Sequence, residues 1–225
     1  MLRTGNQLLF IFSLVAILLP LAPIAMLLVR ESIGRPRNIP LIILCFIAFI
    51  RQILLTAITP TLADSQFINA VFNIAELIVL ALLYQTVLRR KHIKQGLSLL
   101  LAVILSTIIT MYALEGLAVW GYSIELFLSA FMLLISLVAI YSVIADERSF
   151  ILHSPVFWIA SGTLCYHFIF LLGEGLKNYQ LPSANTETER FILLAAVYMT
   201  RYVFYIVAAY FSAEEENKEE ISDIY

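Results

Sequence analysis

Charged residues are scarce in this sequence. Only 13% of its 225 residues are Asp, Glu, Lys or Arg, whereas 61% are hydrophobic, and the mean hydropathy is +0.92. A soluble domain of this size needs a more polar surface, so the composition argues against one. The apolar runs continue over about 20 residues instead of alternating with polar ones, which argues against a membrane β-barrel. The composition therefore predicts an all-α, polytopic membrane protein.

Cysteines and known catalytic motifs are also rare or missing. The two cysteines, Cys45 and Cys165, lie within apolar runs without metal-ligand spacing, so we expect neither a disulfide framework nor a metal site. The sequence contains no Gly-rich phosphate loop, no H-E-x-x-H and no pair of catalytic aspartates. The last apolar run has no lysine for a retinal Schiff base, and a deep histidine pair for heme is missing. We therefore expect no cofactor and no enzymatic activity; an intramembrane hydrolase using Cys165 and His167 is a weak alternative.

Seven stretches are long and apolar enough to cross a bilayer as helices. They are Leu8–Val29, Ile39–Pro60, Phe67–Leu88, Leu97–Leu117, Ile124–Ala145, Pro155–Gly173 and Arg190–Ser212. The first is too long for the apolar part of a signal peptide, so we expect a retained helix, bent at Pro20 and Pro23. Residues 1–212 are thus predicted to form one seven-helix bundle, followed by an acidic tail over residues 213–225.

The distribution of basic residues predicts the orientation, because loops rich in Lys and Arg stay in the cytoplasm. Nine basic residues lie on one side of the predicted membrane: Arg30, Arg35, Arg37, Arg89, Arg90, Lys91, Lys94, Arg148 and Lys218. The other side has three, which are Arg3, Lys177 and Arg190. We therefore expect an outside N-terminus and a cytoplasmic C-terminus.

Four ionisable residues lie at similar depth inside four predicted spans. Arg51, Glu76, His167 and Arg201 are eleven or twelve residues from the expected cytoplasmic end of their spans. At about 1.5 Å per residue this is roughly 16–18 Å into the membrane. An arginine at such a depth costs about 3 kcal/mol on insertion scales, so these side chains should face protein or water. We expect them to form one polar layer between the helices.

Further polar residues share the helical faces of this layer. The last span carries, at i, i+3, i+4 and i+7, the residues Tyr198, Arg201, Tyr202 and Tyr205. The third span carries, at i, i+4 and i+7, the residues Asn69, Asn73 and Glu76. Because these polar stripes extend mostly towards the expected outer side, we expect a cavity that opens outwards and is closed by a more apolar cytoplasmic half.

The charges in the layer are unequal, since two arginines face one glutamate. This surplus favours a site for an anionic ligand, which we assign to Arg51, Glu76, His167, Arg201, Tyr198, Tyr202 and Asn73. The alternative is an internal network that only holds the helices together, through Arg51–Glu76 and Arg201–tyrosine pairs. Such contacts between membrane helices contribute about 0.6 to 2 kcal/mol each.

One segment has a family resemblance. Residues Ser154–Leu172, SPVFWIASGTLCYHFIFLL, contain P-x-F-W followed by small residues and an aromatic cluster. This segment resembles the sixth helix of small seven-helix bacterial membrane proteins, which are similar to the membrane input modules of sensor histidine kinases. The resemblance implies a sensory or regulatory role in a bacterial inner membrane, and it carries over no site residues.

We therefore expect a sensor or receptor subunit that binds a small anionic or polar ligand. No kinase follows the last span, so the signal should pass to a separate cytoplasmic protein. Residues 213–225 are either the segment that docks this protein or a solvated acidic tail. The lipid bilayer is an expected partner and nucleic acid is not. The alternatives are a small transporter that uses the same polar layer and a structural or assembly subunit.

Overall fold

A computed structural model of the chain describes residues 11, 13–33, 38–57, 62–87, 91–115, 117–145, 150–176 and 186–222. Within these ranges all regular secondary structure is helical, which confirms the all-α class. The helices are α2 (Leu21–Val29), α3 (Ile39–Ala57), α4 (Leu62–Val87), α5 (Lys91–Glu115), α6 (Leu117–Ile144), the short 3-10 helix η2 (Ile151–His153), α7 (Pro155–Leu176) and α8 (Thr186–Ser222).

Six of the described helices are long and apolar enough to cross a membrane. The candidate spans cover Ile39–Thr56, Phe67–Gln85, Lys91–Thr110, Ile124–Ile144, Pro155–Gly173 and Ile192–Ala213. Their apolar windows overlap the last six predicted stretches, so the chain is an integral membrane protein.

The first predicted span, residues 8–29, is described only in part. Residues 13–18 are helical, the chain turns at Leu19 and Pro20, and α2 then begins at Leu21. The interruption lies at one of the two predicted bends, because proline lacks an N–H and clashes with the preceding helical turn. Pro23 lies in the first turn of α2, where a missing N–H breaks no helical hydrogen bond. The seventh span stays a prediction.

Several helices are longer than the predicted spans. α4 begins five residues before Phe67 and α5 begins six residues before Leu97. α8 continues ten residues past Ser212 into the acidic segment and ends at Ser222, so residues 223–225 lie outside the described part. The reason is that hydropathy marks where the apolar run ends, whereas helical hydrogen bonding continues through polar residues in water.

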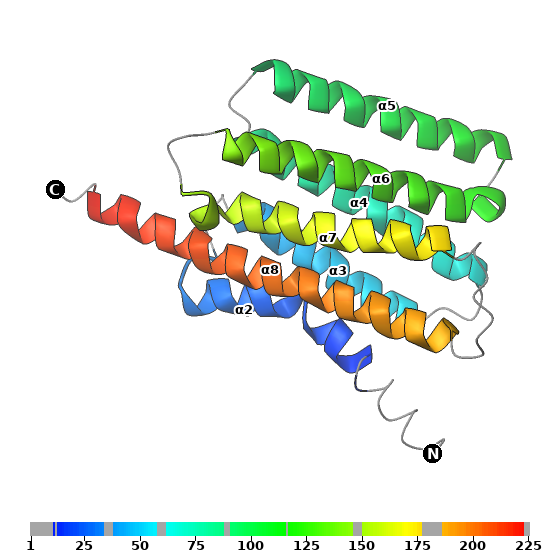
Figure 1. Ribbon diagram of the computed structural model, residues 1–225, viewed down its shortest axis with the longest axis horizontal. Helices are drawn as coiled ribbons and strands as arrows, with labels where there is room; N and C mark the ends of the chain where they lie inside the picture. The colour runs from blue at the N-terminus through cyan, green and yellow to red at the C-terminus, as the bar shows by residue number, and fades with distance from the viewer. Residues whose placement is uncertain are drawn as a thin grey trace.

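The helices form a bundle in which α7 packs between α6 and α8 (Figure 1). α4 packs against both α3 and α6, and α2 packs mainly against α8. α5 lies at one edge of the bundle, where it contacts α4 and α6. The C-terminal part of α8 projects beyond the neighbouring helices in Figure 1. This order places α3, α4, α7 and α8, which carry the predicted polar layer, around the middle of the bundle.

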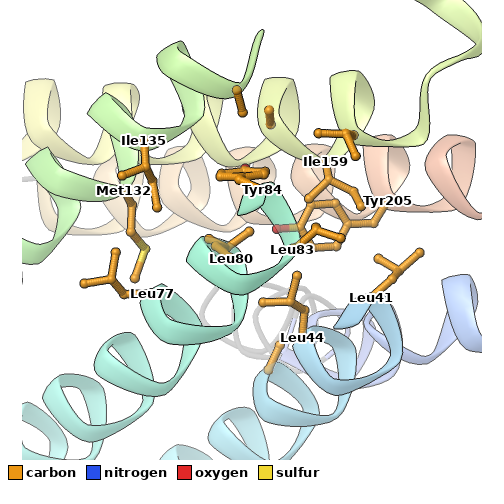
Figure 2. Close-up of a cluster of buried hydrophobic side chains, with 14 of the residues drawn as sticks. Leu41, Leu44, Leu77, Leu80, Leu83, Tyr84, Met132, Ile135, Ile159 and Tyr205 are labelled. Atoms are coloured by element: carbon orange, nitrogen blue, oxygen red, sulfur yellow. The ribbon is translucent and has the colours of Figure 1, made fainter. Parts of the chain in front are cut away.

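Figure 2 shows a cluster of the apolar core to which five of these helices contribute; other core residues come from α2 and α5. The labelled members of this cluster are Leu41 and Leu44 of α3, Leu77, Leu80, Leu83 and Tyr84 of α4, Met132 and Ile135 of α6, Ile159 of α7 and Tyr205 of α8. The two tyrosines bring hydroxyl groups into this otherwise apolar core, and both hydroxyls have hydrogen-bond partners there.

α7 and α8 lie close together at Gly162. A Cβ atom added to Gly162 would lie 2.8 Å from the Cβ atom of Phe204 and 3.1 Å from the carbonyl oxygen of Arg201. Small residues let membrane helices approach in this way. The close approach therefore holds α8 against α7 at the level of Arg201.

Buried polar groups connect the end of α2 and the start of α3 to the C-terminal part of α8. α2 ends in a left-handed cap: Glu31 has φ 57°, and the Ser32 N–H donates to the Leu27 carbonyl at 3.0 Å. The Asn38 side chain donates to the Ser32 carbonyl at 2.8 Å and accepts a hydrogen bond from Ser212 of α8. These contacts hold the end of α2 and the start of α3 against the end of the candidate span in α8.

Candidate functional site

The centre of the bundle contains a buried ion pair between Arg201 of α8 and Glu76 of α4. Arg201 is 2% exposed and Glu76 is 6% exposed, so both charges lie in the interior. A buried pair of this kind is sensitive to its partners, because removing one leaves the other charged and without compensation. Glu76 therefore pairs with Arg201, and the Arg51–Glu76 pairing that we weighed for a purely structural network is wrong.

Tyr205, one helical turn further along α8, also binds Arg201. The Nε and Nη2 atoms of Arg201 donate to the Tyr205 hydroxyl at 2.9 and 2.7 Å. The Thr163 hydroxyl donates to the Ile159 carbonyl at 2.8 Å and lies 2.9 Å from the Tyr205 hydroxyl. Because Thr163 has only one proton, Tyr205 donates to Thr163. The order of donation thus runs from Arg201 through Tyr205 and Thr163 to the backbone of α7.

Arg51 of α3 has a different environment. Its Nε atom donates to the Asn69 side-chain oxygen at 3.0 Å, and its Nη1 atom donates to the Asn73 side-chain oxygen at 2.9 Å. Both acceptors belong to neutral amides of α4. These two hydrogen bonds therefore bring no negative charge to Arg51.

An aromatic cluster from α7 and α8 lies beside both arginines. The Tyr166 ring centroid is 4.9 Å from the His167 ring and 6.0 Å from the Tyr198 ring, and the Tyr198 and Tyr202 rings are 4.9 Å apart. The Arg201 guanidinium carbon is 5.3 Å from the Tyr166 centroid, within the range of a cation–π contact. Arg51 interacts with the Tyr166 hydroxyl and acts electrostatically on His167 and Tyr198.

Two side chains in this cluster are buried without a hydrogen-bond partner in the described structure. They are His167, at both ring nitrogens, and Tyr198, at its hydroxyl. His167 is only 1% exposed. The polar neighbours of Tyr198, which are Gln52 and Tyr202, lie outside hydrogen-bonding geometry. Buried polar groups normally have partners, because leaving one unpaired costs about 1–3 kcal/mol.

All seven predicted site residues are buried, and the contacts connect them across α3, α4, α7 and α8. They are Arg51, Asn73, Glu76, His167, Tyr198, Arg201 and Tyr202. α4 links the two arginines, since Asn73 accepts from Arg51 and Glu76, one helical turn further, pairs with Arg201. Tyr166 was missed by the sequence reasoning, because a tyrosine next to His167 reads as an ordinary interior aromatic residue.

The half of the bundle towards the C-terminal end of α8 also contains buried polar groups. Besides Thr163 and Tyr205, it contains a contact of 3.3 Å between the buried hydroxyls of Tyr84 and Ser136. Asn38 and Ser212 lie still closer to that end. Tyr205 belongs to the polar face already recognised in the last span, and the expectation of a more apolar cytoplasmic half stays a prediction.

The residues that predict the orientation are mostly not described. The side chains of Arg30, Lys91 and Lys94 are described. Those outside the described residues are Arg3, Arg35, Arg37, Arg89, Arg90, Arg148 and Lys177.

Comparisons with protein-family models, with curated proteins and with solved structures find no match for this chain.

Proposed function

We propose that this protein is the receptor subunit of a two-protein signalling system in a bacterial inner membrane. A small anionic or polar ligand enters from outside and binds between α3, α4, α7 and α8. The signal then passes to a separate cytoplasmic protein. The observation that carries this proposal is the buried Arg51, which donates to two neutral amides, beside His167, whose two ring nitrogens have no hydrogen-bond partner among the described residues.

The charge of the polar layer supports a ligand more than a purely structural role. Among the buried side chains that the structure describes, two guanidinium groups and one carboxylate sum to one positive charge. Burying an unpaired charge is costly, so a network that only held the helices together would balance its charges and satisfy its polar atoms. A bound anion supplies the missing charge and the missing acceptors together.

The packing of α8 supports a route for the signal. Arg201 attaches α8 to α4, and Ser212, eleven residues later, attaches the same helix to Asn38. α8 then continues to Ser222. A ligand that changed the position of α8 in the layer would therefore also move its cytoplasmic extension. Such a shift requires that the ligand bind one arrangement of the helices more tightly than the other.

Co-purification tests this proposal. The protein is isolated from native membranes in mild detergent, once as the full chain and once without residues 213–225, and the bound proteins are identified by mass spectrometry. We expect a kinase or response regulator that depends on the tail. If neither form retains such a protein, the receptor proposal fails.

A transporter is the second candidate, and the polar groups beyond the layer favour it. Thr163 and Tyr205, and then Tyr84 and Ser136, extend the polar groups from Arg201 towards the C-terminal end. Solute flux into liposomes that is lost in Arg201→Ala would support transport over signalling. No flux together with a tail-dependent partner would exclude it.

A further inference from the structure

We infer that the ligand is a small monovalent carboxylate, that Arg51 binds its carboxylate group, and that His167 and Tyr198 donate hydrogen bonds to it. In this assignment Arg201 and Glu76 do not contact the ligand; they hold α8 in position. The inference rests on the proposed function, which it narrows to a ligand class and to one half of the polar layer.

Arg201 already has a counter-charge and several other contacts. It forms an ion pair with Glu76, donates twice to Tyr205 and lies over the rings of Tyr166 and Tyr205. A ligand anion that displaced Glu76 would leave a buried carboxylate without its counter-charge. The two acceptors of Arg51 are neutral amides. A ligand anion can therefore pair with the positive charge of Arg51 without displacing a carboxylate from it.

The charge balance favours one negative charge on the ligand. Arg51, Arg201 and Glu76 sum to a single positive charge at this depth when His167 is neutral. A monovalent anion brings the buried sum to zero, whereas a divalent anion leaves it negative in a low-dielectric interior. Glu125 of α6 also acts on Tyr166; it is half-buried and has an interaction of its own, so it is left out of this sum of the buried charges.

The geometry of the donors and the neighbouring tyrosine rings favour a carboxylate over a spherical ion. A guanidinium is planar and matches the two oxygens of a carboxylate. A neutral imidazole supplies one N–H and a tyrosine supplies one O–H, so His167 and Tyr198 add two directed donors. The rings of Tyr166 and Tyr202 flank Tyr198 and provide apolar surface for the organic part of the ligand.

The three histidines of the chain make a direct test possible. In the double variant His92→Gln, His153→Gln, His167 is the remaining histidine, and its ¹⁵N-labelled ring is observed by NMR in lipid nanodiscs at fixed pH and ionic strength. Acetate and benzoate are titrated against chloride, sulfate and phosphate. We expect a saturable change of the His167 signals with the two carboxylates and none with the divalent anions.

Three substitutions locate the site. Arg51→Lys, which keeps the charge but loses the planar fork, should weaken carboxylate binding at least about tenfold. Tyr198→Phe removes one donor and should weaken it about 3- to 10-fold. Arg30→Gln is the matched control, because Arg30 contacts Tyr210, nine residues along α8 from Arg201, and its loss should leave binding unchanged.

Several outcomes would overturn the inference. These are the lack of a saturable response to either carboxylate, a tighter response to sulfate or phosphate, or unchanged binding in both Arg51→Lys and Tyr198→Phe. The titration needs no partner protein, so its failure is separable from that of the proposed function. A tail-dependent partner without carboxylate binding overturns only the inference, and carboxylate binding without a partner overturns only the receptor role.

Discussion

At the residue scale, two arginines at the same depth have opposite surroundings. Arg201 has a carboxylate, a tyrosine hydroxyl that accepts twice, and two aromatic faces. Arg51 donates hydrogen bonds to two amide oxygens of α4. The first environment stabilises a fixed cation, and the second leaves a charge that a ligand can neutralise. This difference yields two predictions about stability.

Tyr205→Phe should destabilise the protein by about 1.5–3 kcal/mol, because it removes the acceptor of two charge-assisted hydrogen bonds from Arg201. Thermal unfolding in detergent measures the effect. Tyr141→Phe is the control, since Tyr141 is 64% exposed on α6 and should change the stability little. Equal unfolding temperatures for the two variants would show that the Tyr205 hydroxyl does not hold Arg201.

Glu76→Gln should cost about 3–5 kcal/mol, because it leaves the buried charge of Arg201 without its counter-charge. Adding Arg201→Met to the same protein should recover part of this loss, since the unpaired charge is then gone. A double-mutant cycle of unfolding free energies isolates the coupling. Additive losses would contradict a direct ion pair.

At the element scale, the position of α8 depends on one close contact with α7. Gly162 has no side chain, so the backbone of α7 lies against Phe204 and the Arg201 carbonyl. Gly173 is on the same helix, and a Cβ atom there would meet nothing within 4 Å. The two glycines therefore give a matched pair for testing the packing of α7 on α8.

Gly162→Ala should destabilise the bundle by about 1–3 kcal/mol, because the added methyl group overlaps Phe204 and pushes α8 away from α7. Gly173→Ala should be neutral or stabilise by up to about 1 kcal/mol, since alanine favours the helix. Unfolding in detergent compares the two. A smaller loss in Gly162→Ala than in Gly173→Ala would contradict the close packing.

At the scale of the whole molecule, the six candidate spans place the α2–α3 connection and the end of α8 on the same side of the membrane. The Asn38–Ser212 hydrogen bond is consistent with this arrangement, because it joins those two segments. That this side is cytoplasmic stays a prediction from the basic loops, and the position of the N-terminus depends on whether residues 8–29 cross the bilayer.

Fusions at the termini test both points. Green fluorescent protein joined after Tyr225 should fluoresce and alkaline phosphatase at the same place should be inactive, because the C-terminus is predicted to be cytoplasmic. An epitope tag before Met1 should be reached by antibody from outside the inner membrane. If the tag is reached only after the membrane is opened, residues 8–29 do not span it.

Much of the fold is determined by the sequence itself, because crossing a bilayer requires long apolar helices with every backbone group paired internally. The depths of Arg51, Glu76, His167 and Arg201 also follow from the sequence, since each helical residue adds a constant rise along the axis. For the same reason the faces of α4 and α8 that carry polar residues could be recognised from periodicity alone.

The pairing within the layer was decided only by the tertiary structure. A sequence states how deep each residue lies, but not how far each helix is rotated about its axis or which helices are neighbours. The packing of α7 on α8 at Gly162 and the orientation of α4 direct Glu76 to Arg201 and leave Arg51 with Asn69 and Asn73. Those rotations come from side-chain packing between helices distant in the chain, which no local pattern encodes.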